Sequence, residues 1–215
     1  MRLVTYEGAE RTQRAGALID ADQAVLDLRR AADAVFGGDT AAFGSVQALI
    51  EAGPATWDAA RALIARAPAE AVVARNAVRL RAPIQPPIQM RDCSCFELHL
   101  RQSFAAARKL RALRSPDPEA ALQAMNTRAD DRVIDTFNRQ PIYYKCNRFA
   151  TIGADDDVVW PHYSKALDFE LEFGCYIGSR AKDVPRERAR EHIFGYTIFN
   201  DISARDAQAV EMGGM

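Results

Sequence analysis

The segment ALDFELEFGCYIG, from Ala166 to Gly178, constrains the fold more than any other stretch of the chain. Successive side chains of a β-strand point to opposite faces, so every second residue shares a face. One face of this segment would carry three carboxylates: Asp168, Glu170 and Glu172. The other would carry a row of apolar side chains: Phe169, Leu171, Phe173, Cys175 and Ile177. The alternation therefore predicts a β-strand whose apolar face is buried and whose second face is acidic.

A second strand is predicted shortly afterwards. Residues 183–195, DVPRERAREHIFG, are typical of a short helix, because Pro185 suits a first helical turn and Gly195 suits the position after a helix end. Residues 196–203, YTIFNDIS, then resume the alternation of a strand. We expect the order strand, short helix, strand, with Asp201 at the end of the second strand.

The row of acids has two interpretations. Charged residues often line the solvated face of an antiparallel strand, so an exposed sheet face is one of them. The other is a cation site, because neighbouring like charges on one face destabilise a sheet and a bound cation removes that cost. Glu170, Glu172 and Asp201 would then supply three oxygen ligands, which suit Mg²⁺ or Mn²⁺ at roughly 2.1 Å. Zinc would favour His or Cys ligands.

The first half of the chain contains short strands followed by helices. Residues 1–30 read as a small β unit with turn residues between alternating runs. Thr40 is the expected N-terminal cap of a helix over residues 41–52, and Pro54 begins the next helix. Prolines 83, 86 and 87 then crowd one segment and mark a junction.

Apolar residues three or four apart predict an amphipathic helix over residues 96–113. We expect two domains, an N-terminal domain over residues 1–77 and a second domain over residues 78–215.

Charge and cysteine content narrow the class of protein. The net charge of −1 offers no strong basic field, so we expect no nucleic acid or membrane partner. No apolar run approaches the roughly 18 residues of a transmembrane helix. The four cysteines lack the density of a disulfide scaffold, which favours reduced thiols and a cytoplasmic protein.

The segment from Leu167 to Gln208 carries a family resemblance. It contains D-F-E-x-E, then I-G, a short helix, and G-Y-T-I-x-N-D-x-S-A-R-D-x-Q. This order resembles the central signature of the fumarylacetoacetate hydrolase family. Met90–Leu100, MRDCSCFELHL, resembles a segment of its 2-hydroxyhepta-2,4-diene-1,7-dioate isomerase-like members. The resemblance implies an α+β fold, with a small N-terminal α/β domain and a catalytic β-roll of mixed strands. Relatives continue well beyond the position of residue 215, so we expect this roll to be incomplete at its C-terminal end.

The resemblance also implies a ligand set. The two glutamates of E-x-E and the later aspartate bind Mg²⁺ or Mn²⁺ in the family, which assigns these roles to Glu170, Glu172 and Asp201. Asp168 receives no ligand role. Some relatives add a further carboxylate ligand shortly before an active-site histidine. Alignment places Cys95 at that position, which favours three ligands in this chain.

Three further residues are implied to act on substrate. The arginine and glutamine of S-A-R-D-x-Q correspond to Arg205 and Gln208, and Arg205 is expected to grip a substrate carboxylate. His99, in F-E-x-H, is the expected general base. Acylpyruvase-like members place a glutamate three residues after this histidine, whereas this chain has Gln102, a departure that weighs against hydrolysis.

The implied function is a metal-dependent enzyme that hydrolyses a C–C bond of, or isomerises, a 2-oxo or diketo acid in aromatic-compound catabolism. An oxaloacetate decarboxylase-like or tautomerase-like activity is one alternative. A non-catalytic domain that binds a metal or a partner is the other. A small-molecule oxo acid is the expected substrate, and family members are commonly homodimers, which makes a homodimer the expected assembly.

Overall fold

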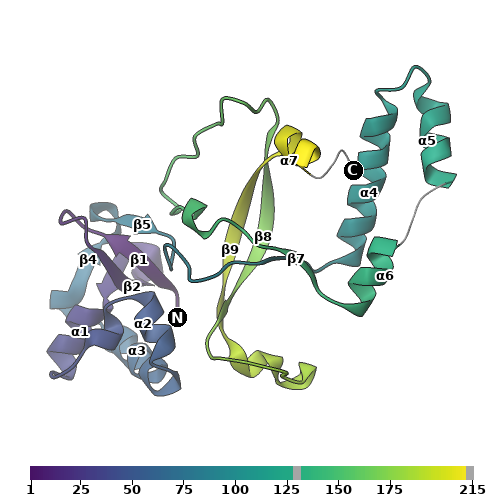
Figure 1. The fold of residues 1–215 in the computed structure, drawn as a ribbon. Helices are drawn as coiled ribbons and strands as arrows, with labels where there is room; N and C mark the ends of the chain where they lie inside the picture. The colour runs from purple at the N-terminus through teal and green to yellow at the C-terminus, as the bar shows by residue number, and fades with distance from the viewer. Residues whose placement is uncertain (128–131, 212–215) are drawn as a thin grey trace. The chain divides into compact units, whose positions relative to one another are not determined.

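The computed structural model describes residues 1–127 and 132–211, which form two compact units (Figure 1). The first unit comprises Met1–Pro86 and Phe149–Glu211, and the second comprises Pro87–Arg148. The first unit therefore combines the N-terminal part of the chain with the acidic strand segment. The boundary between residues 77 and 78 stays a prediction about domains. Helices and strands both contribute, and the predicted α+β class is confirmed.

A five-stranded antiparallel sheet organises the N-terminal part of the first unit. Its strand order is β4-β3-β2-β1-β5. The strands are β1 (Leu3–Glu7), β2 (Gln13–Ile19), β3 (Ala24–Asp27), β4 (Val72–Ala74) and β5 (Arg79–Arg81). The first three are the short alternating runs of the predicted β unit, which is confirmed.

Three helices pack on one face of this sheet (Figure 1): α1 (Leu28–Val35), α2 (Val46–Glu51) and α3 (Pro54–Arg66). The core between the layers contains fully buried Leu26, Leu28, Leu49 and Leu63. Pro54 begins α3 as predicted.

The expected cap of the following helix was wrong. Ser45, and not Thr40, is the N-terminal cap of α2, because its hydroxyl accepts a hydrogen bond from the Ala48 N–H at 3.0 Å. Only a 3₁₀ turn, Ala41–Phe43, follows Thr40. The Thr40 hydroxyl donates to the Asp33 carboxylate and makes no capping hydrogen bond to the turn that follows it.

The rest of the first unit is a long hairpin. β8 (Leu167–Ile177) pairs antiparallel with β9 (Ile193–Ala204), and the short helix α7 (Arg205–Glu211) follows. The predicted helix between the strands is a 3₁₀ helix, Arg186–His192. Gly195 lies within β9 and does not end that helix, because the strand begins at Ile193.

The burial of this hairpin differs from the prediction. The apolar side chains Phe169, Leu171 and Phe173 are 67%, 76% and 71% exposed, whereas Glu170 and Glu172 are half-buried. Alternation identified the strand and its two faces correctly, but it assigned burial to the wrong face. Arg205 and Ser203 cover the acidic face at Glu170.

The base of the hairpin packs on the N-terminal core. The rings of Phe194 and Trp57 meet edge to face, with centroids 5.0 Å apart, and Tyr176 packs against the same core. Gly178 lies beside the Trp57 ring, and a Cβ atom at this position would be only 3.1 Å from that ring. These contacts anchor one end of the hairpin to the helical layer.

The second unit contains helices α4 (Glu97–Ala112), α5 (Pro118–Thr127) and α6 (Arg132–Arg139), and a small pair of strands, β6 (Asp92–Ser94) and β7 (Ile142–Tyr144). The predicted helix over residues 96–113 is confirmed as α4. Among the described residues, no helix combines the length and apolar character needed to cross a bilayer.

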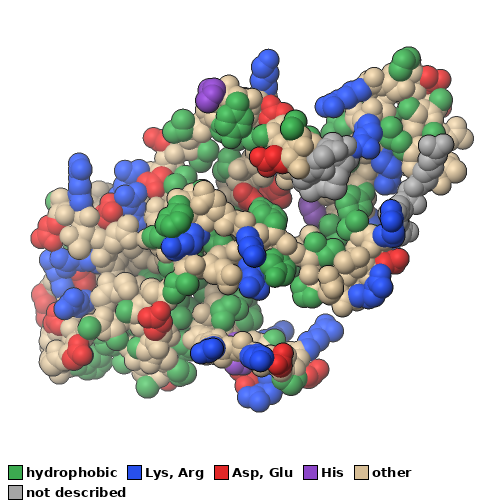
Figure 2. All heavy atoms as spheres, viewed as in Figure 1, with side chains coloured by type: hydrophobic (Ala, Val, Ile, Leu, Met, Phe, Trp, Pro, Cys, Tyr) green, Lys and Arg blue, Asp and Glu red, His purple; other side chains and the backbone are tan. Residues whose placement is uncertain are grey.

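Charges are mixed over the surface that Figure 2 shows. Lys and Arg side chains alternate with Asp and Glu side chains over the N-terminal part of the first unit. The visible face therefore agrees with the net charge of −1.

Candidate metal-binding site

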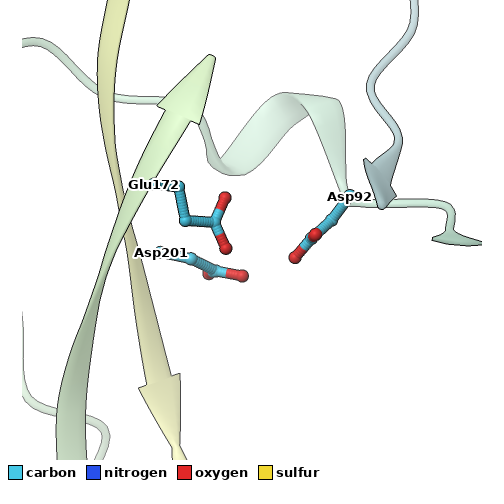
Figure 3. Close-up of side chains that lie close together, drawn as sticks. All are labelled: Asp92, Glu172 and Asp201. Carbon is cyan, nitrogen blue, oxygen red and sulfur yellow. The ribbon is translucent and has the colours of Figure 1, made fainter. Parts of the chain in front are cut away.

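The register of the hairpin gathers the predicted ligands on one face. Glu170 lies directly opposite Asp201, and Glu172 follows two residues along the same face of β8. Figure 3 shows the Glu172 and Asp201 side chains extending to the same side of the hairpin, and carboxylate oxygens of the two lie within 4.8 Å of each other. The structure therefore brings Glu172 and Asp201 together as the cation interpretation requires.

Glu170 has a basic partner that the strand pattern did not reveal. Its Oε1 accepts a hydrogen bond from Arg205 Nη1 at 2.6 Å and another from the Ser203 hydroxyl at 3.3 Å. Arg205 follows directly after β9, so only the register of the two strands brings it to Glu170. The repulsion expected among these acids is thus partly relieved by an arginine.

The same arginine binds a second acid. Arg205 Nε donates to Asp168 Oδ2 at 2.9 Å, and Nη1 also contacts Gln208 Oε1 at 3.2 Å. The hydrogen bond from Arg205, together with one from the Phe169 N–H, lowers the pKa of Asp168 below its usual value. Arg205 and Gln208 therefore lie together on the carboxylate face, as both were predicted to act at one site.

The start of α7 is fixed against the residues that precede β8. The Arg205 N–H donates to the Ala166 carbonyl at 2.8 Å. The Asp206 carboxylate accepts from the Ser164 hydroxyl and from the Lys165 N–H, both at 2.7 Å. The Lys165 N–H is the larger cause of the lowered pKa of Asp206, and the Ser164 hydroxyl adds to it. The backbone that presents Arg205 is therefore fixed at the open end of the hairpin, where β8 begins and β9 ends.

His99 belongs to the second unit. It lies in the first turns of α4, exposed to solvent, with its Nε2 3.3 Å from the Ser103 hydroxyl. Its assignment as a general base stays a prediction.

Asp92 is an acid that the sequence analysis did not select. It lies on β6 of the second unit, half-buried and opposite Tyr144. Cys95, which alignment placed at the additional ligand position, is an exposed thiol three residues later. The available sequence signal was the carboxylate itself, since Asp92 also precedes His99 within the same motif segment.

The donor set fits a hard divalent cation. Carboxylate oxygens are the ligands that Mg²⁺ and Mn²⁺ prefer, and here they come from two adjacent strands. The Ser203 hydroxyl donates a hydrogen bond to one of these carboxylates, that of Glu170. Half-burial of Glu170, Glu172 and Asp201 lowers the local dielectric, which strengthens cation binding relative to open solvent.

Three comparisons place the chain among known proteins. Residues 117–215 match the family profile described as fumarylacetoacetate (FAA) hydrolase C-terminal. An uncharacterized protein of Pyrococcus abyssi is 46% identical over 70 residues, which cover 33% of this chain and 31% of that protein. Oxaloacetate tautomerase fahd2, mitochondrial, of Xenopus laevis is 36% identical over 77 residues, covering 35% of this chain and 24% of that protein.

Solved structures share the fold over nearly the whole chain. A fumarylacetoacetate hydrolase from Exiguobacterium antarcticum aligns with a TM-score of 0.60 and 19% identity, covering 99% of this chain and 59% of that one. A probable 2-hydroxyhepta-2,4-diene-1,7-dioate isomerase from Mycobacterium abscessus aligns with a TM-score of 0.55 and 23% identity, covering 98% and 55%. The matches span less than a third of those two curated relatives and less than two thirds of these solved chains. Residues 117–215 therefore carry the profile of the fumarylacetoacetate hydrolase family, the predicted motif over residues 167–208 lies within that match, and the solved structures share the fold.

Proposed function

We propose that this chain forms the metal-binding strands of a Mg²⁺- or Mn²⁺-dependent enzyme that hydrolyses a C–C bond of, or isomerises, a 2-oxo or diketo acid. The observation that carries the proposal is the shared face of Glu170, Glu172 and Asp201 within the family's domain. Aromatic-compound catabolism, in the cytoplasm, is the proposed setting.

The remaining residues bind substrate and move protons. Arg205 directs its guanidinium at the carboxylate face, and it contacts Asp168 through Nε and Glu170 through Nη1. Nη2 is then the group proposed to donate to a substrate carboxylate. His99 is the proposed general base, and Gln208 holds the Arg205 side chain in place. A bound divalent ion would stabilise the negative charge that develops on substrate oxygens.

Metal binding is the first test of this proposal. A ligand that binds only the folded state stabilises it by about 2.7 kcal/mol at a hundred times its Kd. Mg²⁺ and Mn²⁺ should therefore raise the thermal unfolding temperature of the wild-type chain. Glu172→Gln and Asp201→Asn should abolish this rise.

The matched control is Glu191→Gln, since Glu191 pairs with Arg188 on the 3₁₀ helix and should leave the rise intact. Equal protection of the wild type and both ligand variants would contradict the ligand assignment.

Oxaloacetate tautomerisation is the second candidate function. The similarity to the Xenopus laevis oxaloacetate tautomerase, 36% identity over 77 residues, favours it. Turnover assays with acylpyruvates and with oxaloacetate would separate hydrolysis from tautomerisation. Metal binding without turnover of either substrate would favour a non-catalytic role.

We also propose that two copies of the chain form a homodimer through the apolar face of the hairpin. This apolar face consists of Phe169, Leu171, Phe173, Tyr196 and Ile198, each at least 55% exposed. The opposite face carries the row of acids and would repel a second copy, whereas the net charge of −1 hardly opposes association. On the area scale of aromatic side chains, the apolar face offers roughly 600 Å² per copy. A pair would bury about 1,200 Å², which is the lower bound for a stable specific interface.

A further inference from the structure

Arg205 binds two carboxylates to which we assign different roles. Its Nη1 lies 2.6 Å from Glu170, a proposed metal ligand, and its Nε lies 2.9 Å from Asp168, which has no ligand role. The Arg205 side chain is 38% exposed and that of Glu170 is 26% exposed, so the pair is only partly screened by solvent. The guanidinium therefore holds the position beside Glu170 that a cation would also favour.

A divalent ion that binds Glu170 Oε1 must compete with Arg205 for that oxygen. An ion roughly 2.1 Å from a Glu170 oxygen would stand within a few ångströms of the guanidinium, and the two positive charges would repel each other. Oε1 already accepts hydrogen bonds from Arg205 and Ser203, so an ion that binds this oxygen must displace one of these donors. Coupling between the two cations is reciprocal: each weakens the binding of the other to the same degree.

The contacts of Asp168 allow it to keep its hydrogen bond with Arg205 when a divalent ion displaces Arg205 from Glu170. Its Oδ1 accepts the Phe169 N–H at 2.9 Å, which orients the carboxylate and directs Oδ2 toward Arg205 Nε. Asp168 lies two residues before Glu170 on the same face of β8, so it stays beside the cation site without joining it. When Glu170 turns to a metal, the Asp168 contact through Nε does not need to break.

We propose that Asp168 is a positioning residue that keeps the Arg205 guanidinium beside the cation site when Glu170 exchanges it for a divalent ion. The inference rests on the proposed function, because it takes Glu170 to be a metal ligand. It adds that Arg205 weakens metal binding in the absence of substrate, and that Asp168 prevents the arginine from leaving the carboxylate face.

The first experiment measures metal affinity by calorimetric titration of the full chain with Mn²⁺. Arg205→Met should bind Mn²⁺ about tenfold more tightly than the wild type, because the competing charge is gone. The control is Arg188→Met, since Arg188 also pairs with a glutamate, Glu191, and should leave the affinity unchanged. An Arg205→Met affinity equal to or weaker than that of the wild type would overturn the competition.

The second experiment follows the Arg205 Nε–H resonance by NMR with diamagnetic Mg²⁺, assigned by its loss in Arg205→Met. In the wild type the resonance should persist at saturating Mg²⁺, because Asp168 still accepts this proton. In Asp168→Asn, Mg²⁺ should broaden or remove it, and Asp168→Glu should partly restore it. Loss of the wild-type resonance on adding Mg²⁺ would overturn the role of Asp168.

Different results would overturn the proposed function and the role of Asp168. A folded wild-type chain that binds neither Mg²⁺ nor Mn²⁺ would overturn the proposed function, and the inference with it. Wild-type binding with unchanged affinity in Arg205→Met would overturn the inference alone.

Discussion

Asp156 is a single residue that holds a long connecting segment against the sheet. Both of its carboxylate oxygens accept hydrogen bonds from Arg81 Nη1, Oδ1 at 2.8 Å and Oδ2 at 3.0 Å. Oδ2 also accepts the Gly153 N–H at 2.7 Å. Arg79 adds an ion pair at 2.5 Å. Since the Asp156 side chain is only 11% exposed, these bonds are more shielded than an ordinary surface pair.

The pKa of Asp156 determines how this contribution changes with pH. The Gly153 N–H, followed by the charges of Arg81 and Arg79, lowers the pKa of Asp156 below its usual value. The stabilisation should therefore be fully present above the unfolded-state pKa of about 3.9 and be lost as the pH falls through the lower, folded-state pKa.

We expect Asp156→Asn to lower the free energy of unfolding by about 2 kcal/mol at pH 7, in the range for hydrogen bonds to charged groups. Urea unfolding at a series of pH values is the measurement, and the difference from the wild type should shrink below about pH 4. A difference that stays constant down to pH 2 would contradict the charge-based explanation. Asp58→Asn, which removes one end of an exposed pair with Arg61, should change stability by less than about 0.5 kcal/mol.

The contacts of Arg205 with Asp168 and Glu170 could not be predicted from the sequence. The motif identified Arg205 as a site residue, and alternation placed Asp168 and Glu170 on one face. Their contact depends on the pairing of Leu167 with Ala204, and strand register is set by long-range pairing that no local pattern encodes.

Among the elements, those with a clear period were predicted well. β8, β9, α4 and the N-terminal strands follow from alternation or from apolar residues at helical spacing. α1 was not predicted, because β3 runs directly into it without a turn and three of its eight residues are alanines, which give a weak apolar signal. Its cap is Asp27, a fully buried carboxylate that accepts the Arg30 N–H at 2.9 Å.

Periodicity also cannot state which face of a strand is covered. It identifies two chemically different faces, but burial depends on which other elements pack against each one. Phe169, Leu171 and Phe173 are exposed, because the described contacts of the hairpin with the N-terminal core are confined to its base, near Tyr176 and Phe194.

The packing of Phe194 on Trp57 should control the stability of the hairpin as an element. We expect Phe194→Ala to cost about 3 kcal/mol, as for large aromatic truncations, and to act locally. Trp57 is independently held by its indole N–H, which donates to the Leu49 carbonyl at 2.8 Å, so α3 should remain in place. Hydrogen exchange should then accelerate in Ile193–Ala204 and stay unchanged in Leu3–Glu7.

Phe169→Ala is the matched control for this variant, because Phe169 is 67% exposed and lies at the far end of β8. Equal acceleration in both variants would show that the hairpin is not anchored through Phe194.

At the scale of the whole molecule, the family was predictable because one motif spans two strands and the turn into α7. Leu167–Gln208 lies within the profile match over residues 117–215. The division into two units was not predictable, since the first unit joins residues that are far apart in sequence, such as Arg75 and Asp155. The local sequence around each charged residue does not indicate which distant residue it will pair with.

The proposed homodimer is the whole-molecule property with the most direct test. If two copies pair through the apolar face, sedimentation equilibrium should give twice the 23.8 kDa mass of the chain, and Phe173→Asp or Ile198→Asp should give the single mass. Both side chains are more than 70% exposed and lie opposite each other across the strands, so either charge would fall within the interface. Val159→Asp introduces the same charge at a side chain that is 84% exposed in a loop, and this control should remain dimeric.

Cys175 lies on the same apolar face of the hairpin, opposite Tyr196, so maleimide should label it slowly in the wild type and quickly in Phe173→Asp. A wild-type chain that is monomeric at all concentrations, or a Phe173→Asp variant that stays dimeric with Cys175 still protected, would rule out pairing through this face.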